Sequence, residues 1–248
     1  PDDPASGFAV TVATPRFSHQ YWAERNRFGI LVETHSWKDY PTRVRITRNT
    51  IIDLLEAAAA DGERWLDVAR AADERAARIG GTPVPLTFTN TEHVQTIEFQ
   101  GYAYTREMSP ISGSMVTRYD PNTPQVMQLP LRDEVRPALS VTAPRGGYIV
   151  PAADAWWVAA KLTVHGVGFT RMGTDVRGAD VQTFRAARTM VAPQTNEGHA
   201  VRTFEGAWAP ERRNVPAGSL FVPIAQPKSQ LVMMLFEPQS PEIGRAHV

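Results

Sequence analysis

The chain has 248 residues, of which 42% are hydrophobic and 21% charged, and this predicts a globular protein of one large or two modest domains. Its 26 basic and 26 acidic residues balance, so neither nucleic acid nor a membrane surface is the expected partner, and no apolar run reaches the roughly 18 residues of a membrane span. Cysteine is absent, which excludes disulfides, thiolate metal ligands and a cysteine nucleophile.

The stretch GILVETHS, residues 29–36, is the first segment with a clear pattern. Its aliphatic run predicts a short buried strand over residues 27–33 that ends in Glu33, with His35 two positions further along and therefore on the same face. A buried carboxylate is costly unless it is paired or binds a metal. Two interpretations of Glu33 remain open: a functional site, or a structural ion pair with a nearby cation, namely Arg25, Arg27 or Lys38.

A helix is expected after this strand. Thr42 is a suitable N-cap, and apolar or β-branched residues recur at three-four spacing over residues 44–58. The pair Asp61-Gly62 interrupts the pattern, which then resumes until Gly80-Gly81, either as a second helix or as a kinked extension of the first. The charged outer face is typical of a scaffold helix.

From residue 82 onward, polar residues alternate with apolar and aromatic ones, which predicts a β-rich half. A helix is expected within it over Ala153–His165, with Gly166 as its left-handed stop, and a last short helix begins at Pro227. The expected strands lie near 84–88, 97–99, 116–119, 168–171 and 181–185, with a hairpin-like pair at 203–208 and 219–224. The predicted domain boundary is therefore the break at residues 80–83.

Local motifs for common chemistries are missing from the sequence. No histidine is followed by the His-x-x-x-His or His-x-x-Glu spacing of a helical zinc pair. No Gly-x-Ser-x-Gly elbow occurs, which disfavours a serine hydrolase. The stretch PRGGYIVP lacks the second half of any nucleotide-binding fingerprint and is typical of a β-turn.

The segment Thr14–Thr47, TPRFSHQYWAERNRFGILVETHSWKDYPTRVRIT, resembles the closing part of the catalytic domain of bacterial zinc carboxypeptidases, the metallocarboxypeptidases typified by carboxypeptidase A. In the branch that it resembles, a strand ending in Val-Glu-Thr-His is followed by Lys, Tyr and an Arg-Val helix. The matching residues are Val32, Glu33, Thr34, His35, Lys38, Tyr40, Arg43 and Val44. Two later stretches, GYIVPAADAWWVAAKLTVHGV and PAGSLFVPIAQPKSQLVMMLFEPQSPE, are similar to the same branch.

The resemblance implies an α/β fold: residues 1–81 would be the end of a mixed-sheet α/β/α catalytic domain, and residues 82–242 a β-rich α+β accessory domain. It implies a hydrolase that removes C-terminal amino acids from a peptide substrate, with Glu33 as the general acid/base and Zn²⁺ as the cofactor. In the family, the zinc ligands and the Asn and Arg that hold the substrate carboxylate precede this strand. We therefore expect the chain to be a C-terminal fragment that holds no metal and is inactive alone.

Four further residues have a possible role and a structural alternative. His35 would support Glu33 from the same strand face, or be an ordinary hydrogen-bonded histidine. The type enzyme of the family presents an aromatic hydroxyl on a mobile loop, for which Tyr21 is the nearest candidate. Arg25 and Arg27 would face an anionic group of the substrate, or simply balance surface charge.

Two other functions stay open. In the first, the chain would be part of a catalytically inactive relative whose β-rich half binds peptide or glycan. The Trp156-Trp157 pair would then be a stacking platform for the ligand, and the alternative is that these residues pack in the hydrophobic core. In the second, the chain would be part of an amide hydrolase acting on cell-wall peptides. Family resemblance favours export to the periplasm or the medium, and the sequence leaves the oligomeric state open.

The two ends of the sequence also have an expected explanation. The chain begins at Pro1 without Met, which fits the interpretation as a fragment. Residues 243–248, IGRAHV, resemble an in-frame translation of a sequencing adapter, so we expect them to be a non-native tail.

Overall fold

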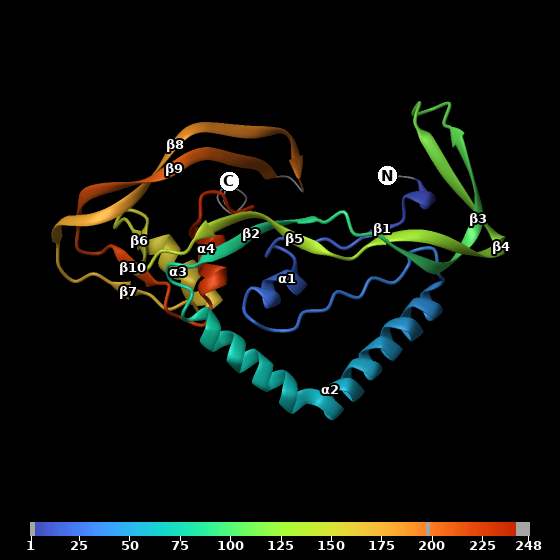
Figure 1. The fold of residues 1–248 in the computed structure, drawn as a ribbon, viewed down its shortest axis with the longest axis horizontal. Helices are drawn as coiled ribbons and strands as arrows, with labels where there is room; N and C mark the ends of the chain where they lie inside the picture. The colour runs from blue at the N-terminus through green and yellow to red at the C-terminus, as the bar shows by residue number, and fades with distance from the viewer. Residues whose placement is uncertain (1–2, 197–198, 242–248) are drawn as a thin grey trace. The chain divides into compact units, whose positions relative to one another are not determined.

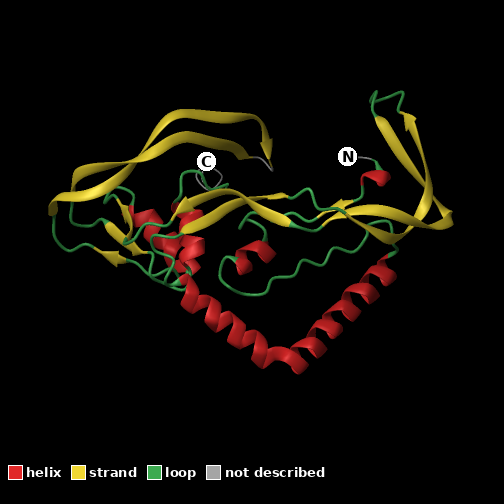
Figure 2. Cartoon of the chain, viewed as in Figure 1, coloured by secondary structure: helices red, strands yellow, loops and turns green. Residues whose placement is uncertain are grey.

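The computed structural model describes residues 3–196 and 199–241, and the predicted tail at 243–248 lies outside them. The fold is mixed α/β (Figures 1 and 2). About 41% of the residues are in strands, which form several sheets, and about 28% are in helices. The helices are the 3₁₀ turn η1 (Pro4–Ser6), α1 (Ser18–Ala23), α2 (Tyr40–Ala76), α3 (Ala155–His165) and α4 (Ser229–Phe236). The strands are β1 (Phe8–Ala9), β2 (Pro83–Asn90), β3 (Gln95–Met108), β4 (Met115–Arg132), β5 (Val135–Thr142), β6 (Gly147–Val150), β7 (Thr170–Arg171), β8 (Val176–Asn196), β9 (His199–Val215) and β10 (Leu220–Pro223). The coarse prediction of an α/β protein is confirmed.

The chain divides into two compact units. Unit 1 comprises Pro1–Val12 and Thr87–Leu139, and unit 2 comprises Ala13–Leu86 and Ser140–Val248. The division falls inside β2 and inside β5, so the predicted boundary near residue 81 lies within unit 2. The assignment of residues 1–81 and 82–242 to a catalytic and an accessory domain stays a prediction.

Unit 1 is built on one three-stranded sheet in the order β1-β4-β3. The strands β3 and β4 form a long antiparallel hairpin whose register shifts between Tyr102 and Tyr104, and β1 adds in parallel, with Phe8 opposite Leu131. The ring of Phe8 packs against Phe99 with centroids 5.0 Å apart, which fixes the N-terminal segment on the sheet.

The buried core of unit 2 is formed by α3, α4 and a small sheet in the order β6-β10-β7. Its fully buried side chains include Leu162 of α3, Leu220 and Val222 of β10, and Leu231 and Met233 of α4. The predicted helix over 153–165 is confirmed, since α3 ends at Gly166, whose φ of 62° is the left-handed conformation that glycine adopts at low cost. The last helix begins two residues after the predicted Pro227.

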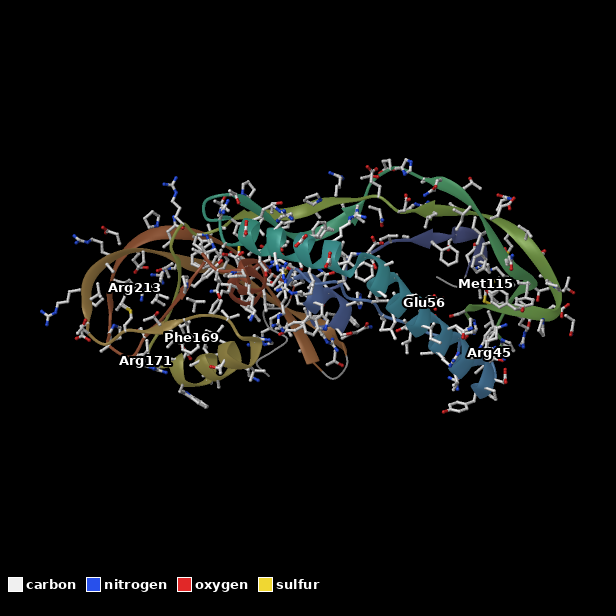
Figure 3. All side chains as sticks on the ribbon, turned by 90° about the horizontal axis from the view of Figure 1, so that it is seen from below. Arg45, Glu56, Met115, Phe169, Arg171 and Arg213 are labelled. Atoms are coloured by element: carbon white, nitrogen blue, oxygen red, sulfur yellow. The ribbon has the colours of Figure 1, made fainter. Side chains whose placement is uncertain are left out.

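The longest element of unit 2 is α2, one helix of 37 residues that bends along its length (Figure 1). Of the two alternatives left open, the kinked extension is therefore the observed one. Its N-cap is Asp39 instead of the expected Thr42, and the only buried residues of the helix are Ala69 and Ala76. Figure 3 shows Arg45 and Glu56 among the exposed side chains of α2. Within the described ranges, no helix combines the length and apolarity needed to cross a membrane.

A second long hairpin is formed by β8 and β9, whose antiparallel register places Phe184 opposite Trp208. The predicted pairing of residues 203–208 with 219–224 is wrong. The turn Pro216–Ser219 separates β9 from β10, and β10 pairs with β6 and β7 instead. Alternating patterns identify strands but not their partners, because the partner depends on contacts between distant residues.

The predicted buried strand over residues 27–33 is also wrong. This segment is irregular, and its apolar side chains are exposed, with Phe28 63% and Ile30 59% accessible. An extended segment becomes a strand only when a neighbour pairs with its N–H and C=O groups, and none of the described strands does so. The backbone at Gly29 lies close to α1, since a Cβ there would be 2.4 Å from the backbone oxygen of His19.

Candidate functional site

The predicted catalytic segment lies on this exposed loop of unit 2. The carboxylate of Glu33 is accessible to solvent and makes no hydrogen bond or ion pair with any described residue. The predicted partner Arg27 binds Asp73 instead. The structural ion pair that was the alternative interpretation of Glu33 is therefore not formed.

His35 contacts its own loop. Its Nδ1 accepts a hydrogen bond of 3.2 Å from the backbone N–H of Trp37, and the two rings pack edge to face with centroids 5.1 Å apart. Both side chains are exposed. The expectation that His35 shares a strand face with Glu33 is not met because residues 27–35 form no strand.

Tyr21, in contrast, takes part in a half-buried polar cluster. Its hydroxyl lies 3.0 Å from Nδ1 of His165, and Nη1 of Arg25 donates to the same hydroxyl at 3.2 Å. Because the arginine can only donate, the tyrosine proton is free to bind Nδ1 of a neutral His165 that carries its own proton on Nε2. Burial lowers the pKa of His165, and Arg25, Lys161 and Lys228 lower it further, so the neutral form is favoured.

Arg25 stacks on aromatic rings next to this hydrogen bond. Its guanidinium carbon lies 5.3 Å from the ring centroid of Tyr21 and 5.0 Å from that of Trp22. Such cation–π contacts stabilise the loop after α1 and hold the charge close to His165. The guanidinium thus has a structural role that is independent of any substrate.

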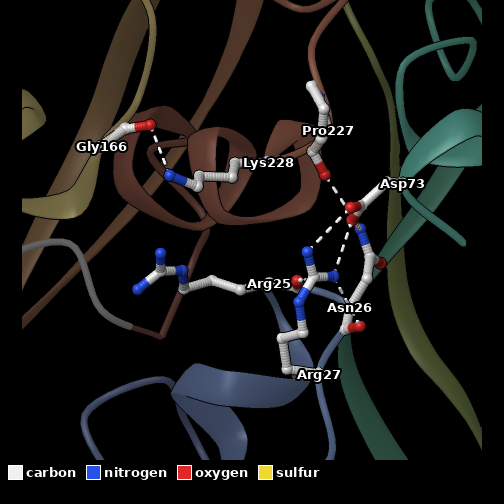
Figure 4. A network of polar contacts seen from close by, with 7 residues as sticks. All are labelled: Arg25, Asn26, Arg27, Asp73, Gly166, Pro227 and Lys228. Atoms are coloured by element: carbon white, nitrogen blue, oxygen red, sulfur yellow. Dashed lines mark hydrogen bonds and ion pairs between the residues drawn. The ribbon is translucent and has the colours of Figure 1, made fainter. Parts of the chain in front are cut away.

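Arg27 forms a two-pronged ion pair with Asp73 of α2, at 3.0 and 2.9 Å (Figure 4). Asn26 also donates to Asp73, at 3.1 Å, and to the carbonyl of Pro227, at 2.9 Å. The hydrogen bond from Arg27 is the main reason that the pKa of Asp73 lies below its usual value. Arg27 therefore connects the loop after α1 to α2.

Lys228 completes the positive charge of this region. Its Nζ donates to the carbonyl of His165, the last residue of α3, and to that of Gly166, the C-cap, and Figure 4 shows the contact with Gly166. Burial lowers the pKa of Lys228, and repulsion from Arg25 and Arg27 lowers it further. We call Arg25, Arg27 and Lys228 the cationic cluster. Its described carboxylate partner is Asp73.

A different part of unit 2 contains a cavity of about 1030 Å³. Aromatic side chains from four strands contribute to its lining, together with Glu237: Tyr148 of β6, Phe184 of β8, Trp208 of β9 and Phe221 of β10. Glu237 is only 3% exposed and accepts hydrogen bonds from the hydroxyl of Tyr148 and from Nε1 of Trp208. The Trp156-Trp157 pair does not belong to this lining, and Trp156 is 75% exposed.

Sequence patterns did not point to His165, Asp73, Lys228 or Glu237. Each of these side chains contacts a residue that is distant in the sequence. Tyr21 and His165, for example, are 144 positions apart. The available signal was the family resemblance of the two later stretches, of which one contains His165 and the other Lys228 and Glu237, but it carried no residue role.

The residues present do not fit a zinc ion. In the part of the chain that the structure describes, no group of three or more His, Cys, Asp or Glu side chains lies close enough to hold a metal. A zinc site with three protein ligands therefore cannot be assembled from these side chains in this arrangement.

Comparisons of the chain with protein-family models, with curated proteins and with solved structures found no match. The interpretation of the site thus depends on the chain's own residues and their contacts.

Proposed function

We propose that this chain is part of a zinc carboxypeptidase-type peptidase in which Glu33 is the general acid/base. The resemblance of Thr14–Thr47 to the catalytic domain of that family supports the assignment. The observation that carries it is the state of Glu33: its carboxylate is exposed and unpaired among the described residues, while Arg27 is already bound to Asp73.

The chemistry assigned to Glu33 is proton transfer. An accessible carboxylate beside a scissile peptide bond accepts a proton from the attacking water and then donates it to the departing amine. The described residues include no group of three or more side chains that could hold zinc, so the proposal assigns the zinc ligands to another part of the parent enzyme. Glu33 is the only residue of this chain to which the proposal gives a chemical step.

The other predicted site residues are not needed for the proposal. Tyr21 binds His165, Arg25 stacks on Tyr21 and Trp22, and Arg27 binds Asp73. His35 contacts Trp37. Each of these contacts explains the residue without a substrate.

The test is hydrolysis of benzoyl-glycyl-phenylalanine by the parent polypeptide, comparing the unchanged enzyme with Glu33→Gln. We expect the substitution to lower kcat/KM by roughly 10²- to 10⁴-fold, the usual contribution of a general acid/base, and to leave the zinc content unchanged. The matched control is Glu56→Gln, an exposed carboxylate on α2, which should change nothing. Equal turnover of the Glu33→Gln and Glu56→Gln variants would refute the assignment.

A second candidate is a catalytically inactive relative whose β-rich half binds peptide or glycan. The cavity lined by Tyr148, Phe184 and Trp208 supports it, because concave sites with aromatic walls and few polar groups are typical of ligand binding. A parent polypeptide that contains no zinc ligands and hydrolyses no peptide would favour this candidate over the first.

A further inference from the structure

The cavity of about 1030 Å³ in unit 2 is lined by several consecutive residues of one strand. Gly147, Tyr148 and Ile149 of β6 all contribute to the lining, and so does Pro151 just after it. Side chains of consecutive strand residues point to opposite faces of a sheet. A cavity that touches all of them therefore borders the edge of β6 and not only one face.

The edge of β6 toward the cavity has unpaired backbone groups. The sheet order is β6-β10-β7, so β6 has one neighbour only. The N–H of Ile224 donates to the carbonyl of Gly146. Along an antiparallel pair, hydrogen-bonded and non-hydrogen-bonded residue pairs alternate. Tyr148 therefore exchanges hydrogen bonds with Val222, which lies opposite it. The N–H and C=O of Ile149 then point away from β10, and no described group binds them.

At the cavity wall, the carboxylate of Glu237 forms no ion pair with a described cation. Its two hydrogen-bond donors, the hydroxyl of Tyr148 and Nε1 of Trp208 at 3.3 Å, are both uncharged. Burial and the adjacent Glu237 raise the pKa of Tyr148, so it remains a donor. A buried carboxylate without a cationic partner is costly, and each of its oxygens can accept a further hydrogen bond.

Two arginines contribute to the lining, Arg145 and Arg213, and the exposed Arg145 forms no ion pair with Glu237 among the described contacts. Arg213, which Figure 3 marks on the hairpin, lines the cavity but binds Glu211 at 3.1 Å. Arg185 of the same hairpin also binds Glu211, at 2.8 Å. Neither forms an ion pair with Glu237 among the described contacts.

An independent observation points to a missing hydrogen-bond partner. Ser219, directly before β10, lines the same cavity and is fully buried, yet its Oγ has no partner in the described structure. Buried hydroxyl groups nearly always have a partner, because leaving one unsatisfied costs about 1–3 kcal/mol. A ligand with polar groups along its length would provide one.

We propose that this cavity binds an extended peptide as an added strand on the free edge of β6, with a basic side chain of the peptide placed against Glu237 and Trp208. A peptide offers the alternating N–H and C=O groups that the edge of β6 lacks. A lysine or arginine side chain offsets the charge of Glu237 and stacks on Trp208, which packs edge to face on Phe184 at 5.6 Å. A neutral glycan provides neither feature. The inference rests on the second candidate function, ligand binding by this cavity, and is independent of Glu33 and of peptidase activity.

The experiment is a calorimetric titration of the 248-residue chain with the acetylated and amidated pentapeptide Thr-Val-Lys-Val-Thr. We expect a Kd on the order of 10⁻⁴ M, corresponding to a binding free energy of about −5.5 kcal/mol. Three control ligands separate the contributions: the same peptide with acetyl-lysine, the same peptide with N-methylated valines, and a neutral tetrasaccharide of N-acetylglucosamine. Each should bind at least about 10-fold more weakly, since the charge, the strand hydrogen bonds or both are lost.

Variants of the chain locate the binding site. Trp208→Ala and Glu237→Gln should each weaken the lysine peptide by about 10-fold, and Trp156→Ala, which removes an exposed tryptophan outside the cavity, should not. Trp208 is partly exposed, so its truncation keeps the test valid if Glu237→Gln fails to fold. The proposal is overturned if the lysine peptide does not bind at millimolar concentration, if N-methylation leaves its affinity unchanged, or if only the tetrasaccharide binds.

Discussion

The hydrogen bond between Tyr21 and His165 fixes α1 against the end of α3, although the two residues are 144 positions apart. Three cations, Arg25, Lys161 and Lys228, act on the imidazole and disfavour its protonation. Nδ1 can accept the tyrosine proton only while the ring is neutral. The contact therefore depends on pH.

Acidification should destabilise unit 2 through His165. Its pKa in the folded chain lies below the ordinary value of 6.5, so the unfolded chain binds the proton more tightly, and stability is lost as the pH falls from 6.5 through the folded pKa. We expect the Tm to drop by a few degrees between about pH 7.5 and about pH 5.5, with a smaller drop in His165→Gln, because the glutamine amide accepts the same hydrogen bond without titrating. Thermal unfolding followed by circular dichroism measures both. An identical pH profile for the two proteins would contradict this.

The ion pair of Arg27 with Asp73 should contribute measurably to stability. Asp73→Ala removes two hydrogen bonds from Arg27 and one from Asn26, and we expect a loss of about 1 kcal/mol, a modest value because the arginine side chain is nearly half exposed. The measurement is urea denaturation. Asp67→Ala is the control: its pair with Arg70 lies on one exposed helix face, and we expect a change of at most about 0.3 kcal/mol. Equal losses of unfolding free energy in the two variants would show that the ion pair of Arg27 stabilises the protein no more than an exposed surface pair does.

At the scale of elements, α2 shows which features local sequence predicts well. The three-four spacing of apolar residues correctly indicated a helix, and the Asp61-Gly62 interruption correctly indicated a kinked extension as one alternative. The strand over residues 27–33 failed for a physical reason, since a strand needs a partner that its own residues cannot specify. The pairing of β10 failed for the same reason.

Gly62 offers a test of α2 as a single element. It lies inside the helix, and a Cβ added there would meet nothing within 4 Å. Gly62→Ala should therefore stabilise the protein by about 0.5–1 kcal/mol, because alanine loses less backbone entropy than glycine in a helix. Ala60→Gly, on the same helix, should lose a similar amount, and both changes can be measured by urea denaturation. Destabilisation by Gly62→Ala would indicate that the helix needs glycine at this position for its bend.

At the scale of the whole molecule, the mixed α/β class followed from the sequence, whereas the side chains that meet across the fold did not. Glu33 was proposed as a site residue because a single local segment resembles a catalytic strand end of a known family, and its role stays a prediction. Glu237 and Trp208 were not, since their contact joins α4 to the β8–β9 hairpin and neither residue belongs to a spacing motif. Local patterns identify elements, but a site assembled from several elements depends on their packing.

The exposed carboxylate of Glu33 and the lack of a metal-binding group among the described residues lead to one expectation for the parent protein. If Glu33 is a general acid/base of a zinc peptidase, the zinc ligands must be encoded elsewhere in the same gene. Under the proposed function, the family resemblance would put them before this segment.

The most direct measurement is therefore the coding sequence immediately upstream of Pro1 in the source DNA. The proposed function predicts a His-x-x-Glu pair, a later histidine and an arginine for the substrate carboxylate in the same reading frame. An upstream reading frame in which these residues are replaced would contradict the assignment of Glu33.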